Sequence, residues 1–101
     1  MPALSERRQT ALDDLKKQAA ALSTVSREMN EMLASKRPQE LRPSGALKAI
    51  SAAAYACEAA LVAAGDEDPI PWALIQGIQE NQMLIQDTAN ALVIFHELAK
   101  R

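Results

Sequence analysis

Apolar residues recur every three or four positions through the first third of the chain. They are Leu4, Ala11, Leu12, Leu15, Ala19, Leu22, Val25, Met29, Met32 and Leu33. This spacing matches an α-helix that buries one face, so it predicts one long helix over about residues 5–36. Roughly thirty-two residues at ~1.5 Å each give a rod of about 48 Å, longer than one layer of a domain of this size needs. We therefore expect part of this helix to pack outside its own subunit.

Two prolines, Pro38 and Pro43, interrupt the pattern and predict a linker over residues 37–44, since each disfavours helix in the residue before it. Ser44 can then cap a second helix that runs to about Ala64. Gly65 follows, and we expect it to end this helix in a left-handed turn. Ten of residues 46–64 are alanine. A neighbouring helix can therefore approach the second helix closely.

A further pair of prolines, Pro69 and Pro71, precedes the point where the periodic pattern resumes. The apolar positions that follow are Leu74, Ile75, Ile78, Ile85, Ala89, Leu92, Phe95 and Ala99. They predict a third helix over about residues 71–99. The acidic residues 66–68 lie just before it, where the positive end of a helix favours negative charge.

If the second and third helices form an antiparallel hairpin about the 65–70 turn, the numbers of contacting residues sum to about 135. Cys57 then faces Ile78, and Gly77 lies against the alanine-rich face, where its missing side chain allows close approach. Asn81 and Thr88 fall on the apolar stripe of the third helix. Buried there, they would fix register and oligomeric state, and exposure at the edge of the stripe is an equally good interpretation.

The pattern predicts an all-α chain that forms a single domain over residues 1–101. It consists of a long helix (5–36), a linker (37–44) and an antiparallel hairpin region (45–99). The two helices of the hairpin are expected over about 44–64 and 71–99. Twenty of the 101 residues are alanine and only three are aromatic, so the core must be thin. A small domain of this composition has little stability to spare. We therefore expect a helical bundle completed by dimerisation.

Charge and cysteine content restrict which classes of partner and which cellular compartment are expected. A net charge of −2 gives no general attraction to polyanions, so direct nucleic-acid binding is disfavoured and no membrane partner is expected. Basic pairs such as Arg7 and Arg8 alternate with acidic residues and are interpreted as a solvated face. Cys57 is the only cysteine, which fits a reducing, cytoplasmic location without disulfides. The polar start does not resemble a signal peptide, and no run approaches a membrane span.

Few residues suggest catalysis or metal binding. The chain has one histidine, His96, and one cysteine, whereas metal sites need several such ligands. Cys57 has no basic residue within a helical turn and is interpreted as a small core residue. We therefore predict no catalytic residue, no metal and no cofactor. Trp72 is interpreted as packing the 65–71 turn against the core, and an exposed anchor is the alternative.

The strongest functional signal is the apolar run in residues 91–98, near the end of the third helix. Five consecutive apolar residues, 91–95, cannot share one helix face, so at least two surfaces need a cover. The first helix, a second subunit or a partner can supply it. We predict a protein interface formed by nine residues of the first and third helices: Leu22, Val25, Met29, Met32, Leu33, Leu92, Val93, Phe95 and His96.

These observations predict a small non-enzymatic protein that forms a homodimer and binds another protein through helix packing. Its size and layout resemble those of small bacterial antiactivators and secretion chaperones, which sequester a partner in this way. The resemblance implies a regulator. The alternative is a self-assembling structural component of a phage or secretion apparatus. A third hypothesis is a nucleic-acid-associated or enzymatic role that needs a partner to complete the site.

Overall fold

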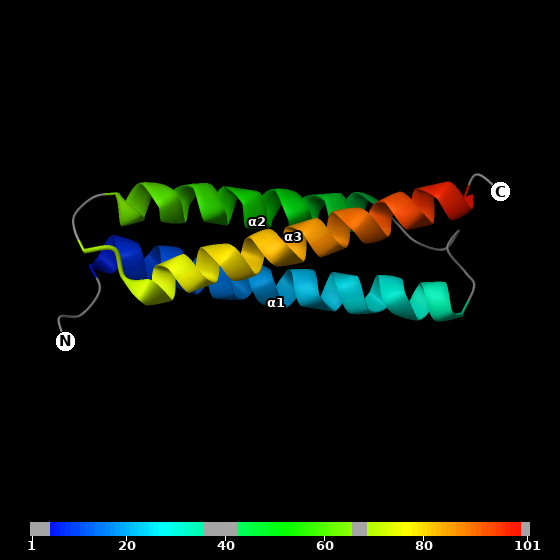
Figure 1. The fold of residues 1–101 in the computed structure, drawn as a ribbon, viewed down its shortest axis with the longest axis horizontal. Coiled ribbons are helices and arrows are strands. Elements are labelled where there is room, and N and C mark those ends of the chain that lie inside the picture. Colours follow the sequence, from blue (N-terminus) through cyan, green and yellow to red (C-terminus); the bar gives the residue numbers. More distant parts are fainter. Residues whose placement is uncertain (1–4, 36–42, 66–68, 100–101) are drawn as a thin grey trace.

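Three long helices run side by side in a rod of 54 × 18 × 16 Å (Figure 1). The computed structural model describes residues 5–35, 43–65 and 69–99, which form α1 (Glu6–Ala34), α2 (Pro43–Ala64) and α3 (Trp72–Ala99). α1 and α3 run in one direction and α2 runs in the opposite direction (Figure 1). Each helix packs against the other two, so α1 lies along α2 and α3 of its own chain. The all-α prediction is confirmed.

The bounds of α1 follow from local hydrogen bonds. Ser5 caps its first turn, because the Ser5 hydroxyl accepts the backbone N–H of Arg8 at 3.3 Å. The helix ends at Ala34, two residues before the predicted end. There the backbone N–H of Ser35 donates to the carbonyl oxygen of Glu31 at 3.0 Å, which closes the last turn.

α2 ends without the left-handed glycine that the sequence predicts. The N–H of Gly65 donates to the carbonyl oxygens of Leu61 and Val62 at 3.1 Å each, and its φ lies outside the left-handed region. The Arg8 side chain donates to the last two carbonyl oxygens of α2, those of Ala63 and Ala64, so a left-handed turn is not needed to satisfy them. The predicted linker lies mostly outside the described residues, as do the acidic residues 66–68.

The predicted pairing of Cys57 with Ile78 is present, since Cys57 Sγ lies 3.9 Å from the carbonyl oxygen of Ile78. The prediction for Gly77 is wrong. A Cβ at Gly77 would lie 3.0 Å from Leu15 Cδ1 and 3.5 Å from Leu12 Cδ1, so this glycine faces α1 and not the alanines of α2. Consecutive residues of an α-helix point about 100° apart, so Gly77 and Ile78 cannot both face α2. Ile78 faces α2, and Gly77 therefore points toward α1.

The buried apolar residues form two clusters along the rod. The turn-side core, at the end near the α2–α3 turn, contains Ala11, Leu12, Leu15, Ala56, Cys57, Ala60, Ala63, Ala64, Leu74 and Ile78. The far core contains Met29, Ala46, Ala91 and Phe95, with Val25, Met32, Leu33 and Leu92 packed against it. Along α3, the buried polar residues Asn81 and Thr88 lie between Ile78 of one core and Ala91 of the other.

One stretch of α2, Gly45–Ala64, is long and apolar enough to cross a membrane by its length and composition. The expectation that no run approaches a membrane span is therefore wrong. The mean hydropathy is high because ten of these 20 residues are alanine and only two, Lys48 and Glu58, are charged. Within the bundle, 33% of the stretch is buried, and alanines of α2 contribute to both cores.

Candidate functional site

Large apolar side chains are exposed on α2, on α3 and in the turn between them, and on none of the described residues of α1. They are Leu47, Tyr55, Leu61, Val62, Ile70, Trp72, Met83, Val93 and Ile94. Single exposed apolar residues are ordinary on soluble proteins. Contiguous exposed apolar patches, in contrast, are typical of interaction sites.

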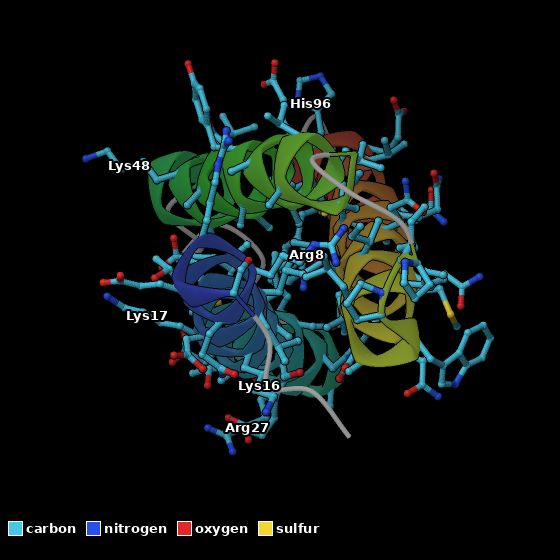
Figure 2. All side chains as sticks on the ribbon, turned by 90° about the vertical axis from the view of Figure 1, so that its left-hand side faces the viewer. Arg8, Lys16, Lys17, Arg27, Lys48 and His96 are labelled. Carbon is cyan, nitrogen blue, oxygen red and sulfur yellow. The ribbon has the colours of Figure 1, made fainter. Side chains whose placement is uncertain are left out.

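The exposed residues in the middle of α2 form one continuous face, which we call the α2 face. It consists of Leu47, Lys48, Ser51, Ala54, Tyr55, Glu58, Ala59, Leu61 and Val62. Lys48 and Glu58 are its only charged residues, and Lys48 points away from the bundle (Figure 2). Tyr55 is 73% exposed, the largest value among the exposed apolar residues. The α2 face is therefore apolar, open and nearly uncharged.

A second exposed feature runs along α3. Trp72, Met83 and Ile94 recur at intervals of eleven residues, or about three helical turns, so they lie along one line on the helix. We call these three residues the α3 line. Exposed amides accompany them at Gln76, Gln79, Gln86 and Asn90. Trp72 is 64% exposed, so the interpretation that it packs the turn against the core is wrong.

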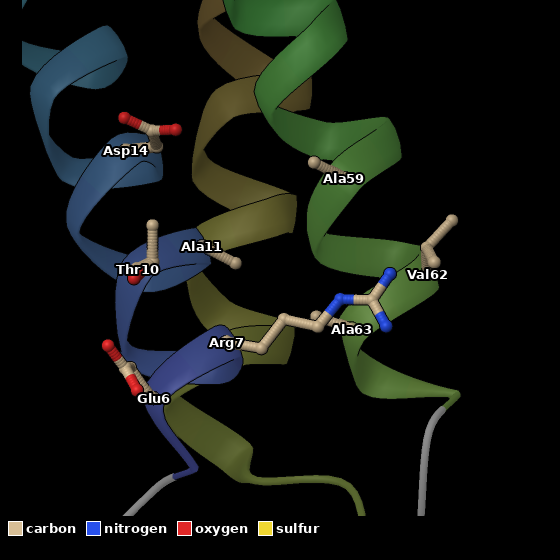
Figure 3. Close-up of a pocket in the computed structure, with 8 residues that line it drawn as sticks. All are labelled: Glu6, Arg7, Thr10, Ala11, Asp14, Ala59, Val62 and Ala63. Carbon is tan, nitrogen blue, oxygen red and sulfur yellow. The ribbon is translucent and has the colours of Figure 1, made fainter.

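A shallow groove of about 700 Å³ lies between the start of α1 and the end of α2 (Figure 3). Ala11, Ala59 and Ala63 line it, and their small side chains leave the space open. Other lining residues are Glu6, Arg7, Thr10, Asp14 and Val62. Figure 3 shows the Arg7 side chain extending from α1 across to Ala63 and Val62. Its charged lining residues are two acids, Glu6 and Asp14, and one base, Arg7, so the groove has no strong charge that would select one class of ligand.

Arg8 ties α1 to the end of α2 and to the following turn. Its side chain is buried and points between the helices (Figure 2). Nε donates to the carbonyl oxygen of Ala63 at 3.1 Å, Nη2 to that of Ala64 at 2.9 Å, and Nη1 to that of Pro69 at 3.1 Å. The last carbonyls of a helix lack partners within the helix, and a cation is favourable there. We call this arrangement the Arg8 clamp.

The prediction that Arg8 lies on a solvated face is wrong, and the sequence contained a signal for its burial. Arg8 precedes Leu15 by seven residues, and Leu22 and Met29 continue the same heptad position. All three of these apolar residues are fully buried. A basic residue in register with a buried stripe thus indicated a buried cation with carbonyl partners.

The two polar residues on the α3 stripe are both buried, which decides between the two interpretations of their positions. Asn81 Nδ2 donates to the carbonyl oxygen of Leu15 on α1 at 2.9 Å and to that of Gly77 at 3.0 Å. Within the part of the chain that the structure describes, its Oδ1 has no hydrogen-bond partner. Thr88 Oγ1 donates to the carbonyl oxygen of Leu84 at 2.7 Å. Asn81 therefore links α3 to α1 at one level and disfavours a shifted register.

The nine residues of the predicted interface divide into a buried group and an exposed pair. Leu22 is fully buried, and Val25, Met29, Met32, Leu33, Leu92 and Phe95 belong to the far core or pack against it. α1 thus supplies much of the cover that the 91–98 run needs. Val93 and His96 are exposed. Contact of any of the nine with a second protein stays a prediction.

Groups with catalytic or metal chemistry are dispersed. Within the described ranges 5–35, 43–65 and 69–99, no three His, Cys, Asp or Glu residues come close enough to hold a metal ion. Burial raises the pKa of the Cys57 thiol, and its Sγ lies in the turn-side core. A protonated, enclosed thiol is a poor nucleophile.

The chain matches no protein-family model, no curated protein and no solved structure.

Proposed function

We propose that this chain is a non-enzymatic protein-interaction module, a regulator that binds and sequesters a partner protein through helix packing. The observation that carries the proposal is the gathering of exposed large apolar residues on α2 and α3. The bundle has two cores of its own, so these residues are not needed to complete it. Removing such side chains from water is the principal driving force of most protein association.

A pull-down from the cells that produce the protein tests this proposal. Tagged wild-type chain is compared with Tyr55→Asp on the α2 face, Met83→Asp on the α3 line and Ala20→Asp on the exposed side of α1. We expect the wild type and Ala20→Asp to recover a foreign protein in stoichiometric amount. At least one of the other two variants should lose it, because a carboxylate in a desolvated contact is unfavourable.

Two results would count against the regulator. If the wild type recovers no foreign protein, the chain does not sequester one under these conditions. If it recovers only itself as an assembly larger than a dimer, the structural-component alternative is supported. Light scattering of the eluted material separates these two results.

A further inference from the structure

We propose that the α2 face binds the α2 face of a second copy of the chain, with the two helices antiparallel about a two-fold axis at the height of Ala53. The inference rests on the proposed function, since it names one partner of the interaction module. A two-fold interface brings the same patch of both copies together, so the patch must complement itself. The residues of the α2 face meet this condition in charge and in size.

The two charged residues complement each other in the antiparallel arrangement. Residues at the same height then have numbers that sum to about 106, which pairs Lys48 of one copy with Glu58 of the other. Relative to the direction opposite Ala53, the two lie about 40° to either side, within reach across two packed helices. A parallel arrangement would instead place Lys48 beside Lys48 and Glu58 beside Glu58. Charge therefore selects the antiparallel pair.

The large and small residues of the α2 face alternate in the same register. Tyr55 stands at the height of Ser51 of the second copy, and Leu47 stands at the height of Ala59. Val62 lies along the direction opposite Ala53, and Ser51 and Tyr55 lie about 20° to either side of it, so Tyr55 faces Ser51 of the second copy. Leu47 and Ala59 lie about 60° to either side, at the edges of the contact. A large side chain opposite a small one is how packed helices interdigitate without voids. Every member of both pairs is exposed in a single copy, so each is accessible to the second.

A second copy suits this face better than a lipid surface. Helices that lie on membranes carry several basic residues on their polar face, whereas α2 has Lys48 alone. The outward side of α2 also carries Ser51 and Glu58, which would enter the apolar layer unpaired. In the antiparallel pair, Glu58 keeps a cationic partner.

The geometry also predicts the strength of association. A helix of 22 residues is about 33 Å long and about 10 Å wide, so one face buries roughly 330 Å² per copy. Stable complexes bury about 800 Å² per partner. The dimer is therefore weak and depends on protein concentration. Sedimentation equilibrium must extend to high micromolar protein to populate it.

The first experiment is sedimentation equilibrium of the purified full chain at increasing concentration. We expect a monomer–dimer equilibrium for the wild type, with the dissociation constant raised at least ~10-fold in Tyr55→Asp. Met83→Asp is the matched control, because Met83 is 68% exposed but lies on α3. It should dimerise as the wild type does. Circular dichroism verifies that both variants remain helical.

Charge exchange tests the orientation. Lys48→Glu places two acidic groups together at each end of the contact, and Glu58→Lys places two basic groups together. Each should weaken dimerisation by roughly 10-fold, because attraction becomes repulsion at two symmetric sites. The double variant restores both pairs and should recover wild-type affinity. Failure of the double variant to recover would overturn the antiparallel pairing.

Cross-linking tests the register, in a background where Cys57 is replaced by alanine. A mixture of Leu47→Cys and Ala59→Cys chains should form a heterodimer with a short thiol-reactive cross-linker. Leu47→Cys alone should not, because two copies of position 47 lie about 18 Å apart along the pair. Cross-linking of Leu47→Cys with itself would establish a parallel pair and overturn the proposal.

Failure of this inference can be separated from failure of the proposed function. A wild-type chain that stays monomeric at every concentration, yet recovers a foreign protein in the pull-down, overturns only the dimer. A dimer that recovers no foreign protein supports the inference and contradicts the sequestering regulator. Vesicle binding by a monomeric chain, lost in Tyr55→Asp, would assign the α2 face to lipid and overturn the proposal.

Discussion

The two cores of the bundle are built from different side chains. Five of the ten residues of the turn-side core are alanine, and its large members are the branched residues Leu12, Leu15, Leu74 and Ile78. The far core depends on Met29 and Phe95, with further large residues around them. Small residues bring helix backbones together and make packing sensitive to a single added methyl group, whereas methionine adapts its shape. One bundle thus combines a close-fitting end, held by the Arg8 clamp, with a more adaptable end.

The largest expected effect is the loss of stability when a buried residue of the far core is replaced, compared with an exposed residue nearby. Phe95→Asp should cost about 4 kcal/mol or more, because Phe95 is 3% exposed and its replacement buries a carboxylate. Val93→Asp, two residues away, should change stability by about 0.5 kcal/mol or less, since Val93 is 61% exposed. Thermal melts followed by circular dichroism compare the two. Equal loss in both variants would contradict the assigned burial of Phe95.

The next largest effect is the loss of stability when the Arg8 clamp is removed from the turn-side end of the bundle. Arg8→Met keeps much of the side-chain volume but leaves the carbonyls of Ala63, Ala64 and Pro69 without their donor, and should cost about 3 kcal/mol. Arg7→Met changes the same charge at an exposed position and should cost less than about 1 kcal/mol. Urea unfolding measures both variants. A smaller loss at Arg8 than at Arg7 would show that the clamp does not stabilise this end.

A smaller effect tests how closely the turn-side core is packed. Gly77→Ala should destabilise by about 1 kcal/mol, because the new methyl group would lie 3.0 Å from Cδ1 of the fully buried Leu15. This is a net value: overpacking costs about 2 kcal/mol, and the gain in helix propensity offsets about 1 kcal/mol of it. Gly45→Ala is the control, since no atom lies within 4 Å of the added group. It should leave stability unchanged or raise it slightly, and a gain in both variants would contradict close packing at Gly77.

The smallest effect concerns the pH dependence of the turn-side core. Burial raises the pKa of the Cys57 thiol, so the unfolded chain ionises this group first as the pH rises. Its contribution to stability is fully present below the thiol pKa of the unfolded chain, about 8.5, and is lost as the pH rises through the folded pKa. Cys57→Ala should lack this loss. The measurement is the difference in unfolding free energy between the two proteins from pH 7 to pH 10.

The sequence predicted the helices well because their signals are local. Apolar spacing and the prolines each act within a few residues, and α1, α2 and α3 lie close to the predicted bounds. The pairing of Cys57 with Ile78 followed from the turn position and antiparallel geometry alone. Neither inference needs to know how α1 lies against the other two helices.

The failures concern how α1 sits against the other two helices. Gly77 was placed against α2 because two-helix reasoning offered no other neighbour, and it contacts Leu15 of α1. Arg8 was assigned to solvent because its acceptors lie 55 or more residues away in the chain. For the same reason the sequence left open what covers Phe95, since apolar spacing does not tell whether another chain or α1 lies against it.

The Arg8 clamp also has a consequence for the order of events during synthesis. Arg8 is synthesised before its acceptors, which are at residues 63, 64 and 69. Until those residues are made, the clamp cannot form and does not fix the position of α1 against the end of α2. The Arg8 clamp can therefore form only after residue 69 has been made. Before that point this end of the bundle is not closed, and chaperones that recognise exposed apolar segments have access to it.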